Sequence, residues 1–212
     1  MAFEPLTPER RRAMTREHLL EAAAIVFARA GFAGATLDEI AATAGFTKGA
    51  VYSNFKSKDD LFLALVDDRI ERQFALVGEV LDTSTHEPGE LLSRMHDLLG
   101  TRAFFFFDDT LSTLYLEFVL YARRNPEARA KLAAIGERSR AFTQELIERE
   151  HEIHGTTPPY PPRELAQIAM ALFLGFEVDR LVDRASVTDQ TIDTALAILS
   201  EFMGAGDKSP RT

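Results

Sequence analysis

Residues 36–61 read TLDEIAATAGFTKGAVYSNFKSKDDL and contain two short helical patterns joined by a glycine turn. Thr36 and Glu39 have the spacing of a capping box, in which a hydroxyl and a carboxylate satisfy backbone amides at the start of a helix. The first helix is therefore predicted to begin at Thr36 and to end before Gly45. The second starts after Thr47 and extends to about Asn54. A connection this short, with a glycine in it, is typical of a helix-turn-helix.

Along the rest of the chain apolar residues recur at intervals of three and four, and no stretch alternates in the way a half-buried strand would. The predicted fold class is therefore all-α. Besides the two helices above, we expect helices over residues 15–30, 58–81, 88–106, 109–124, 126–152, 163–184 and 188–204, about nine in total. The proline-rich stretch 155–162 cannot be helical and predicts a stiff connector before the last two helices.

The composition is that of an ordinary globular protein, with 212 residues of which 46% are hydrophobic and 27% charged. The lack of cysteine excludes disulfides and thiolate metal sites and is compatible with a reducing cytoplasm. The longest apolar run, Ile168–Phe176, is about half the length that spans a bilayer, and the first residues do not form a secretion signal. We therefore expect a cytoplasmic protein that has no membrane partner.

The net charge of −9 argues against a nucleic-acid partner when it is taken alone, because binding strength comes largely from cations that neutralise phosphates. The charge is distributed unevenly, however. Residues 1–58 hold eight Lys and Arg against six Asp and Glu, which gives about +2 for this segment and −11 for the remainder. An acidic remainder would repel phosphate and leave one face suited to DNA.

The motifs TLDEIA at 36–41 and AGFTKGAVYSNFKSKDDL at 44–61 resemble the DNA-binding signature of the TetR family of transcriptional regulators. The resemblance is close over residues 15–65 and looser over the whole chain. Asn54 stands where His or Tyr is frequent in the family, and Lys56 where Pro is frequent. The resemblance implies an N-terminal three-helix DNA-binding domain over residues 1–57 and a C-terminal ligand-binding and dimerisation domain over 58–204. Residues 205–212 are expected to form a disordered tail.

A helix that enters the major groove must present small residues in its first turn, and Gly49 and Ala50 meet that demand. Glycine inside a helix costs about 1 kcal/mol relative to alanine, so Gly49 indicates close approach either to DNA or to a neighbouring helix. Lys48 is predicted to contact guanine, and the resemblance places Tyr52 and Lys58 on the phosphate backbone. The full set of predicted DNA contacts is Thr36, Thr47, Lys48, Gly49, Ala50, Tyr52, Ser53, Asn54 and Lys58.

Some of these residues have simpler interpretations. Thr36 and Thr47 taken singly are helix caps, and Tyr52 alone would be a half-buried aromatic residue. Arg10, Arg11, Arg12 and Arg16 are expected to precede the first helix, either as a flexible arm that reaches phosphates or as a solvated basic tail.

The last two predicted helices carry apolar stripes at helical spacing, which favours a four-helix bundle formed by two copies of the chain. The alternative is that the stripes serve only the core of one copy. The predicted dimer interface consists of Leu165, Ile168, Leu172, Phe176, Ile192, Leu196, Leu199 and Phe202.

The middle of the chain is rich in aromatic and aliphatic residues, and family resemblance implies a cavity there for a small apolar or aromatic effector. Solid core is the alternative for any single residue. The predicted pocket residues are Phe104, Phe107, Leu111, Leu114, Tyr115, Phe118 and Phe173.

No cofactor loop, nucleophile motif or metal cluster is expected. His151 and His154 flank Glu152, but their spacing lacks a further ligand, and a solvent-facing helix end explains them. The predicted function is a palindrome-binding homodimeric regulator, a repressor that a small-molecule inducer releases, and not an enzyme. The competing hypothesis is a helical carrier or enzyme that does not bind DNA, which would have no need of the motifs in residues 36–61.

Overall fold

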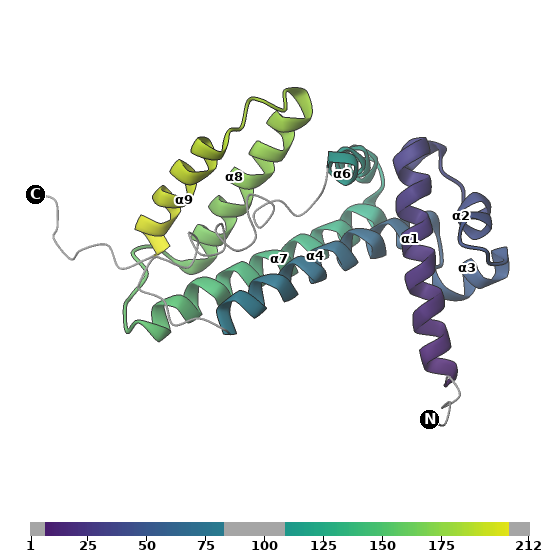
Figure 1. Cartoon of the computed structure of the whole chain (residues 1–212), viewed down its shortest axis with the longest axis horizontal. Coiled ribbons are helices and arrows are strands. Elements are labelled where there is room, and N and C mark those ends of the chain that lie inside the picture. The colour runs from purple at the N-terminus through teal and green to yellow at the C-terminus, as the bar shows by residue number, and fades with distance from the viewer. Residues whose placement is uncertain (1–6, 83–108, 204–212) are drawn as a thin grey trace, which may run out of the picture. The chain divides into compact units, whose positions relative to one another are not determined.

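The computed structural model describes residues 7–82 and 109–203, and the regular structure within these two stretches is entirely helical (Figure 1). The prediction of an all-α fold is confirmed. None of the helices described there is long and apolar enough to cross a membrane. The helices are α1 (Pro8–Gly34), α2 (Leu37–Thr43), α3 (Lys48–Asn54), α4 (Lys58–Asp82), α6 (Asp109–Ala122), α7 (Pro126–Ile153), α8 (Pro162–Val182) and α9 (Asp189–Met203).

The predicted ends of α2, α3, α4, α6, α7, α8 and α9 agree with the structure to within two residues. Asn125, predicted as the break between α6 and α7, accepts hydrogen bonds through Oδ1 from the amides of Glu127 (3.1 Å) and Ala128 (3.2 Å), and so caps α7. The helix predicted over 88–106, the pocket residues Phe104 and Phe107, and the predicted tail over 205–212 lie outside the described residues.

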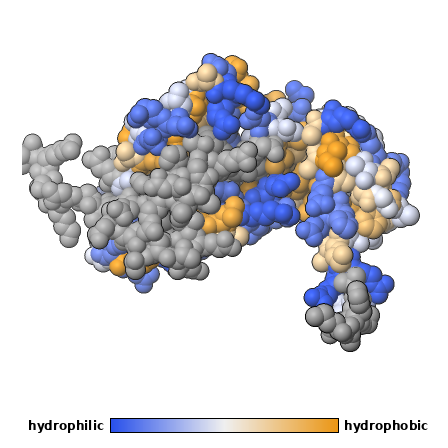
Figure 2. All heavy atoms as spheres, viewed as in Figure 1, coloured by the Kyte–Doolittle hydropathy of each residue, from blue (hydrophilic) through white to orange (hydrophobic). Residues whose placement is uncertain are grey.

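The first helix begins seven residues earlier than predicted. The Thr7 hydroxyl accepts a hydrogen bond from the Arg10 amide at 3.3 Å, Pro8 occupies the first turn, and Glu9 adds an acidic group there. Because these residues form a complete helix start, the arginines at 10, 11, 12 and 16 lie within α1, and the prediction that they precede the first helix, as an arm or as a tail, is wrong. In Figure 2 the N-terminal end of α1 is accordingly blue, next to the grey terminus.

The helix predicted over residues 15–30 ends just before Gly31, whereas the structure has a kink at that residue and the helix continues. Its φ of 68° and ψ of 171° belong to a region that is open almost only to glycine. The chain then completes a further turn to Gly34, and the Ala35 amide donates to the Gly31 carbonyl at 3.2 Å. The kink thus directs the chain from α1 into the Thr36 cap of α2.

The described residues form two compact units. Unit 1 contains residues 7–68 and 113–132, which are α1–α3, the start of α4, most of α6 and the start of α7. Unit 2 contains residues 69–82, 109–112 and 133–203. The predicted boundary after residue 57 follows the end of the helix-turn-helix, whereas unit 1 extends beyond it to include parts of three later helices.

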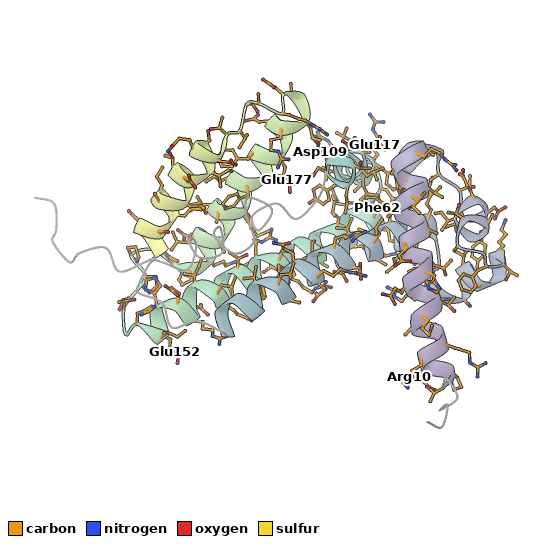
Figure 3. All side chains as sticks on the ribbon, in the orientation of Figure 1. Arg10, Phe62, Asp109, Glu117, Glu152 and Glu177 are labelled. Atoms are coloured by element: carbon orange, nitrogen blue, oxygen red, sulfur yellow. The ribbon has the colours of Figure 1, made fainter. Side chains whose placement is uncertain are left out.

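An aromatic cluster holds unit 1 together. Phe62 of α4 lies 5.3 Å from Phe27 and 5.3 Å from Phe32 of α1, measured between ring centroids, and 4.7 Å from Phe118 of α6. Phe27, Phe62 and Phe118 are completely buried (Phe62 is labelled in Figure 3). Aromatic pairs of this geometry contribute about 0.5–1.5 kcal/mol each beyond the area they bury. The cluster therefore explains why α6 belongs to the same unit as α1.

Polar contacts add to this cluster. The Glu117 carboxylate of α6 accepts a hydrogen bond from the Phe32 amide at 2.8 Å, next to the kink in α1 (Figure 3). Lys131 of α7 forms an ion pair with Asp60 of α4 at 2.6 Å, and its hydrogen bond to Asp60 raises the pKa of the lysine. The α6 and α7 parts of unit 1 are thus attached to α1 and α4 by both apolar and polar contacts.

The core of unit 2 is formed by buried apolar residues of α4, α7, α8 and α9. Phe74 of α4 also stacks on Phe142 of α7, with ring centroids 3.8 Å apart. The helices of the α8–α9 pair therefore pack on each other and on α7 within a single copy of the chain. The cluster consists of Val77, Ile147, Leu165, Ala166, Ala169, Phe173, Ile192, Leu196 and Leu199.

The prediction that His151 and His154 occupy a solvent-facing helix end is wrong. His151 is 3% exposed, and its Nδ1 lies 2.6 Å from the Thr156 hydroxyl. Burial lowers the pKa of His151, so its imidazole is neutral at pH 7. The reason is local: after α7 ends, the chain folds back so that Thr156 covers the histidine, and the Thr156 amide donates to the His151 carbonyl at 2.9 Å.

Replacing Gly31 with alanine should lower the free energy of unfolding by about 1–3 kcal/mol, because the added Cβ would occupy a glycine-only conformation and lie 3.1 Å from Glu117 Oε2. Urea unfolding followed by circular dichroism would measure the loss. The matched control is Gly34→Ala in the same helix, where the new Cβ meets only Ala30 Cβ at 3.6 Å. Equal stability of the two variants would show that a side chain at residue 31 does not strain the kink.

Candidate nucleic-acid interface

Residues 37–54 form a helix-turn-helix. Residues 44–47 separate α2 from α3, and Gly45 in this turn has a φ of 73°. The turn is closed by hydrogen bonds from the Phe46 amide to the Ala41 carbonyl (2.9 Å) and from the Gly45 amide to the Ala42 carbonyl (3.1 Å). Glycine tolerates the positive φ without strain, which allows the abrupt change of direction between the two helices.

Both helices are capped as predicted. The Thr36 hydroxyl accepts from the Glu39 amide at 3.2 Å, and the Thr47 hydroxyl accepts from the Ala50 amide at 3.3 Å. The carboxylate of Glu39 accepts a hydrogen bond from Arg29 of α1, where the capping-box prediction had it bonded to the backbone of residue 36. The Arg29–Glu39 pair therefore attaches α2 to α1.

Helix α3 has one buried side and one exposed side. Val51 and Phe55 are 0% and 3% exposed and form the buried side. The opposite side presents Lys48, Gly49, Tyr52 and Ser53 to solvent, while Ala50 and Asn54 are half-buried. The residues predicted to contact DNA on α3 are thus mostly the ones that an approaching molecule can reach.

Gly49 distinguishes the two explanations that the sequence left open. A Cβ built on Gly49 would meet only the Thr47 hydroxyl, at 3.7 Å, which is ordinary contact. Among the helices that the structure describes, none requires glycine at this position. The other explanation, close approach to DNA, stays a prediction.

Two arginines of α1 contact the C-terminal end of α3. The Arg12 guanidinium donates to the Ser53 carbonyl at 3.1 Å, and the Arg16 guanidinium lies 4.6 Å from the centroid of the Phe55 ring. Both residues were expected in a flexible arm or a solvated basic tail, and this positioning role was not predicted. Their spacing of four residues on a helix was the available signal, but it is informative only once α1 is known to begin at Pro8.

Lys48 is paired with Asp38 of α2. Its ammonium lies 2.7 Å from Asp38 Oδ1 and 2.9 Å from Oδ2, and both side chains are more than half exposed. The hydrogen bond to Asp38 raises the pKa of Lys48. The residue predicted to contact a base is therefore held by the carboxylate of Asp38, a contact that was not predicted.

Ser53 and Asn54 use their side-chain donors within α3. The Ser53 hydroxyl and the Asn54 amide group each donate to the Ala50 carbonyl at 2.8 Å. A DNA contact by either residue would use an acceptor or a remaining donor of its side chain.

Lys58 lies at the start of α4 and points toward the end of α1. Its ammonium donates to the carbonyls of Ala33 (3.1 Å) and Ala35 (3.0 Å) and lies 4.8 Å from the Phe32 ring centroid. These carbonyls follow the kink at Gly31, so Lys58 caps the last turn of α1. The structure thus gives Lys58 a contact within the chain that the sequence did not indicate, and its contact with phosphate stays a prediction.

The predicted pocket residues that are described lie mostly in the cores of the units. Phe118 is part of the aromatic cluster of unit 1, and Phe173 is part of the core of unit 2. A cavity of about 600 Å³ occurs in unit 1 where α1, α4 and α6 meet, but it is lined by Gly31, Lys58, Glu117, Tyr121 and their neighbours. None of the predicted pocket residues that the structure describes lines it. Of the other described pocket residues, Leu111 and Leu114 are buried and Tyr115 is half-buried.

The predicted dimer residues differ in how much of their surface stays exposed in one chain. Leu165, Ile192, Leu196 and Leu199 are at most 5% exposed within one chain, so these four have almost no area left to bury against a second copy. Leu172 and Phe176 are partly buried against the same core, and the side chain of Phe202 lies outside the described set. Ile168 alone of the described predicted residues is well exposed, at 58%.

Comparison with known proteins supports the assignment of the helix-turn-helix. Residues 19–65 match the family model described as bacterial regulatory proteins, tetR family. The HTH-type transcriptional regulator AcrR of Shigella flexneri is 37% identical over 86 residues, which is 40% of this chain and 38% of that protein. The HTH-type transcriptional repressor AcnR of Corynebacterium diphtheriae is 35% identical over 104 residues, or 46% and 52% of the two chains. The chain thus matches about two fifths to one half of the length of these curated relatives.

A solved structure shows a similar fold over nearly the whole chain. It is the transcriptional regulator FadR from Bacillus subtilis in complex with stearoyl-CoA, which covers 90% of this chain and 98% of its own, with a TM-score of 0.64 and 17% identity. At this identity the similarity concerns the fold.

Replacing Lys58 with methionine should lower the free energy of unfolding by about 1–2 kcal/mol, because two carbonyls at the end of α1 lose a charged donor. Lys56→Met is the control, since Lys56 is exposed and lies only two residues away; it should change stability by less than about 0.5 kcal/mol. Chemical unfolding of both variants measures the difference. If Lys58→Met were as stable as the native protein, the lysine would be available for phosphate after all.

Proposed function

We propose that this chain, which belongs to the TetR family of transcriptional regulators, is a homodimeric DNA-binding regulator that recognises a pseudo-palindromic operator with α3. The observation that carries the proposal is that only one side of α3 is buried. Val51 and Phe55 are buried, whereas Lys48, Gly49 and Tyr52 are exposed. A helix held in this way can enter the major groove without losing its core contacts.

The proposed DNA contacts follow from exposure and chemistry. Lys48 donates to a guanine edge, and Gly49 and Ala50 allow the helix backbone to come close to the bases. Thr36, Thr47 and Tyr52 supply hydroxyl groups for phosphate oxygens, and Ser53 and Asn54 extend the same surface. The positive balance of residues 1–58, against −9 for the whole chain, orients this side toward DNA.

Dimerisation is proposed to use the exposed side of α8. Ile168, Ala171, Gly175, Val178 and Val182 follow one another at spacings of three, four, three and four residues, and all five are exposed. We call this set the α8 seam. Such spacing produces one continuous apolar line on a helix, and the small residues at its centre allow two helices to approach closely. Ile198 of α9, 50% exposed, adds to the apolar surface of the same helix pair.

The regulatory part of the proposal concerns a small effector. We infer that a small apolar or aromatic molecule binds in the region 58–204 and shifts the dimer away from the arrangement that fits both half-sites, so that the protein acts as a repressor in the cytoplasm. Support comes from relatives: AcnR is named a repressor, and the FadR structure contains stearoyl-CoA, a ligand with a long apolar chain. An effector of this kind works only if it binds the two arrangements with different affinities.

A non-DNA-binding carrier or enzyme is the competing function. Gly49 argues against it, because no described atom of the chain explains its lack of a side chain, whereas close approach to DNA would.

Selection of bound fragments from genomic DNA is the test of the proposed function. The purified protein should enrich a short sequence with two related halves, whose centres lie about one helical turn or a multiple of it apart. On the selected duplex, Tyr52→Phe should weaken binding several-fold without changing the salt dependence, because the lost hydroxyl is uncharged. Recovery of fragments with no shared sequence would contradict the proposal.

Replacing Val178 with glutamate should convert the dimer to a monomer. Two unpaired carboxylates would be buried near the twofold axis, so the dimer dissociation constant should rise at least about a hundredfold. Sedimentation velocity measures the effect, and operator affinity should fall with it. Ile153→Glu, at an apolar residue of α7 that is 54% exposed and outside the α8 seam, is the control and should remain dimeric. A dimeric Val178→Glu protein would place the interface elsewhere.

A further inference from the structure

We propose that Asp38 is a specificity-determining residue of the DNA-binding surface. Its ion pair with Lys48 disfavours binding of the lysine to phosphate more than binding to a base edge. This inference rests on the proposed DNA-binding function. Neither side chain needs to move far for the pair to open, because Asp38 and Lys48 are 62% and 56% exposed.

The positions of the two residues explain why they pair. Asp38 lies in the first turn of α2, where the positive end of the helix dipole favours a carboxylate. Lys48 is the first residue of α3, where the same dipole disfavours a cation. The carboxylate therefore compensates an unfavourable position of the lysine, and the two oxygens of Asp38 engage the ammonium together at 2.7 and 2.9 Å.

The restraint is selective because the competing acceptors differ in charge. Guanine offers two neutral acceptors, O6 and N7, which can replace the two carboxylate oxygens. A phosphate can also replace them, but it brings a negative charge within a few ångströms of Asp38. At such distances, in water, this repulsion amounts to about a fivefold loss of affinity. Asp38 thus weakens binding of Lys48 to phosphate more than binding to a base.

The pair is also weak enough to open. Exposed ion pairs contribute little to stability, so breaking this one costs a small part of the binding free energy. The pair therefore acts as a competitor for Lys48 and does not block it.

The neighbouring residue provides a matched comparison. Glu39 carries the same charge one position later, but its carboxylate pairs with Arg29 of α1. Replacing either acid with its amide changes the net charge by the same amount. Only Asp38→Asn frees Lys48.

The experiment measures affinity for the selected duplex and for a random-sequence duplex at several salt concentrations. Asp38→Asn should raise affinity for the random duplex about fivefold, and the slope of log affinity against log salt concentration should become steeper by about one. Affinity for the selected duplex should change by less than about twofold. Glu39→Gln should change both by less than about twofold. In a Lys48→Met background, Asp38→Asn should also have less than about a twofold effect, because the carboxylate acts through the lysine. Thermal unfolding of each variant verifies that it is folded.

Two results would overturn the inference. Equal effects of Asp38→Asn and Glu39→Gln would show that only net charge matters. A larger loss on the selected duplex than on the random one would show that Asp38 itself accepts a hydrogen bond from a base. Failure of the proposed function is recognised separately, because the native protein would then bind both duplexes equally before any substitution is made.

Discussion

A helix of seven residues is too short to be stable by itself in water, so the orientation of α3 depends on the two side chains that it buries. Val51 and Phe55 provide this burial, and α3 contacts both α1 and α2. Arg12 and Arg16 add contacts at the C-terminal end. Every functional property proposed for the exposed side of α3 follows from this attachment, since a loosely held helix would not present a fixed set of donors to a groove.

The same reasoning extends to the rest of unit 1. The turn from α1 into α2 depends on the kink at Gly31, which is contacted from α6 through Glu117 and followed by carbonyls that bind Lys58 of α4. Behind these polar contacts, Phe62 and Phe118 pack against Phe32. Residues 113–132 are therefore structurally part of the unit that holds the helix-turn-helix. A displacement of α6 would move the kink at Gly31 and with it the start of α2.

Much of this fold was predictable because the signals are local. Capping residues, the Gly45 turn and the three- and four-residue spacing of apolar positions depend on neighbours in the chain, and they located seven helices to within two residues. The start of α1 was misplaced because the cap at Thr7 is followed by a basic segment that looks like a tail. The partners of Lys48 and Lys58 were not predictable, since a lysine with a flexible stem can reach any acceptor nearby, and only packing decides which one is near.

By itself, the sequence determined the helical class, the two caps and the glycine turn of the helix-turn-helix, and the residues from which a DNA-binding surface could be built, because helix formation and capping act over a few residues. Tertiary structure decided which side of each helix is buried. It placed Leu165, Ile192, Leu196 and Leu199 in the core of one chain and left the α8 seam exposed. An apolar stripe indicates only that one face of a helix is buried. Which neighbour covers that face depends on contacts between residues far apart in the chain.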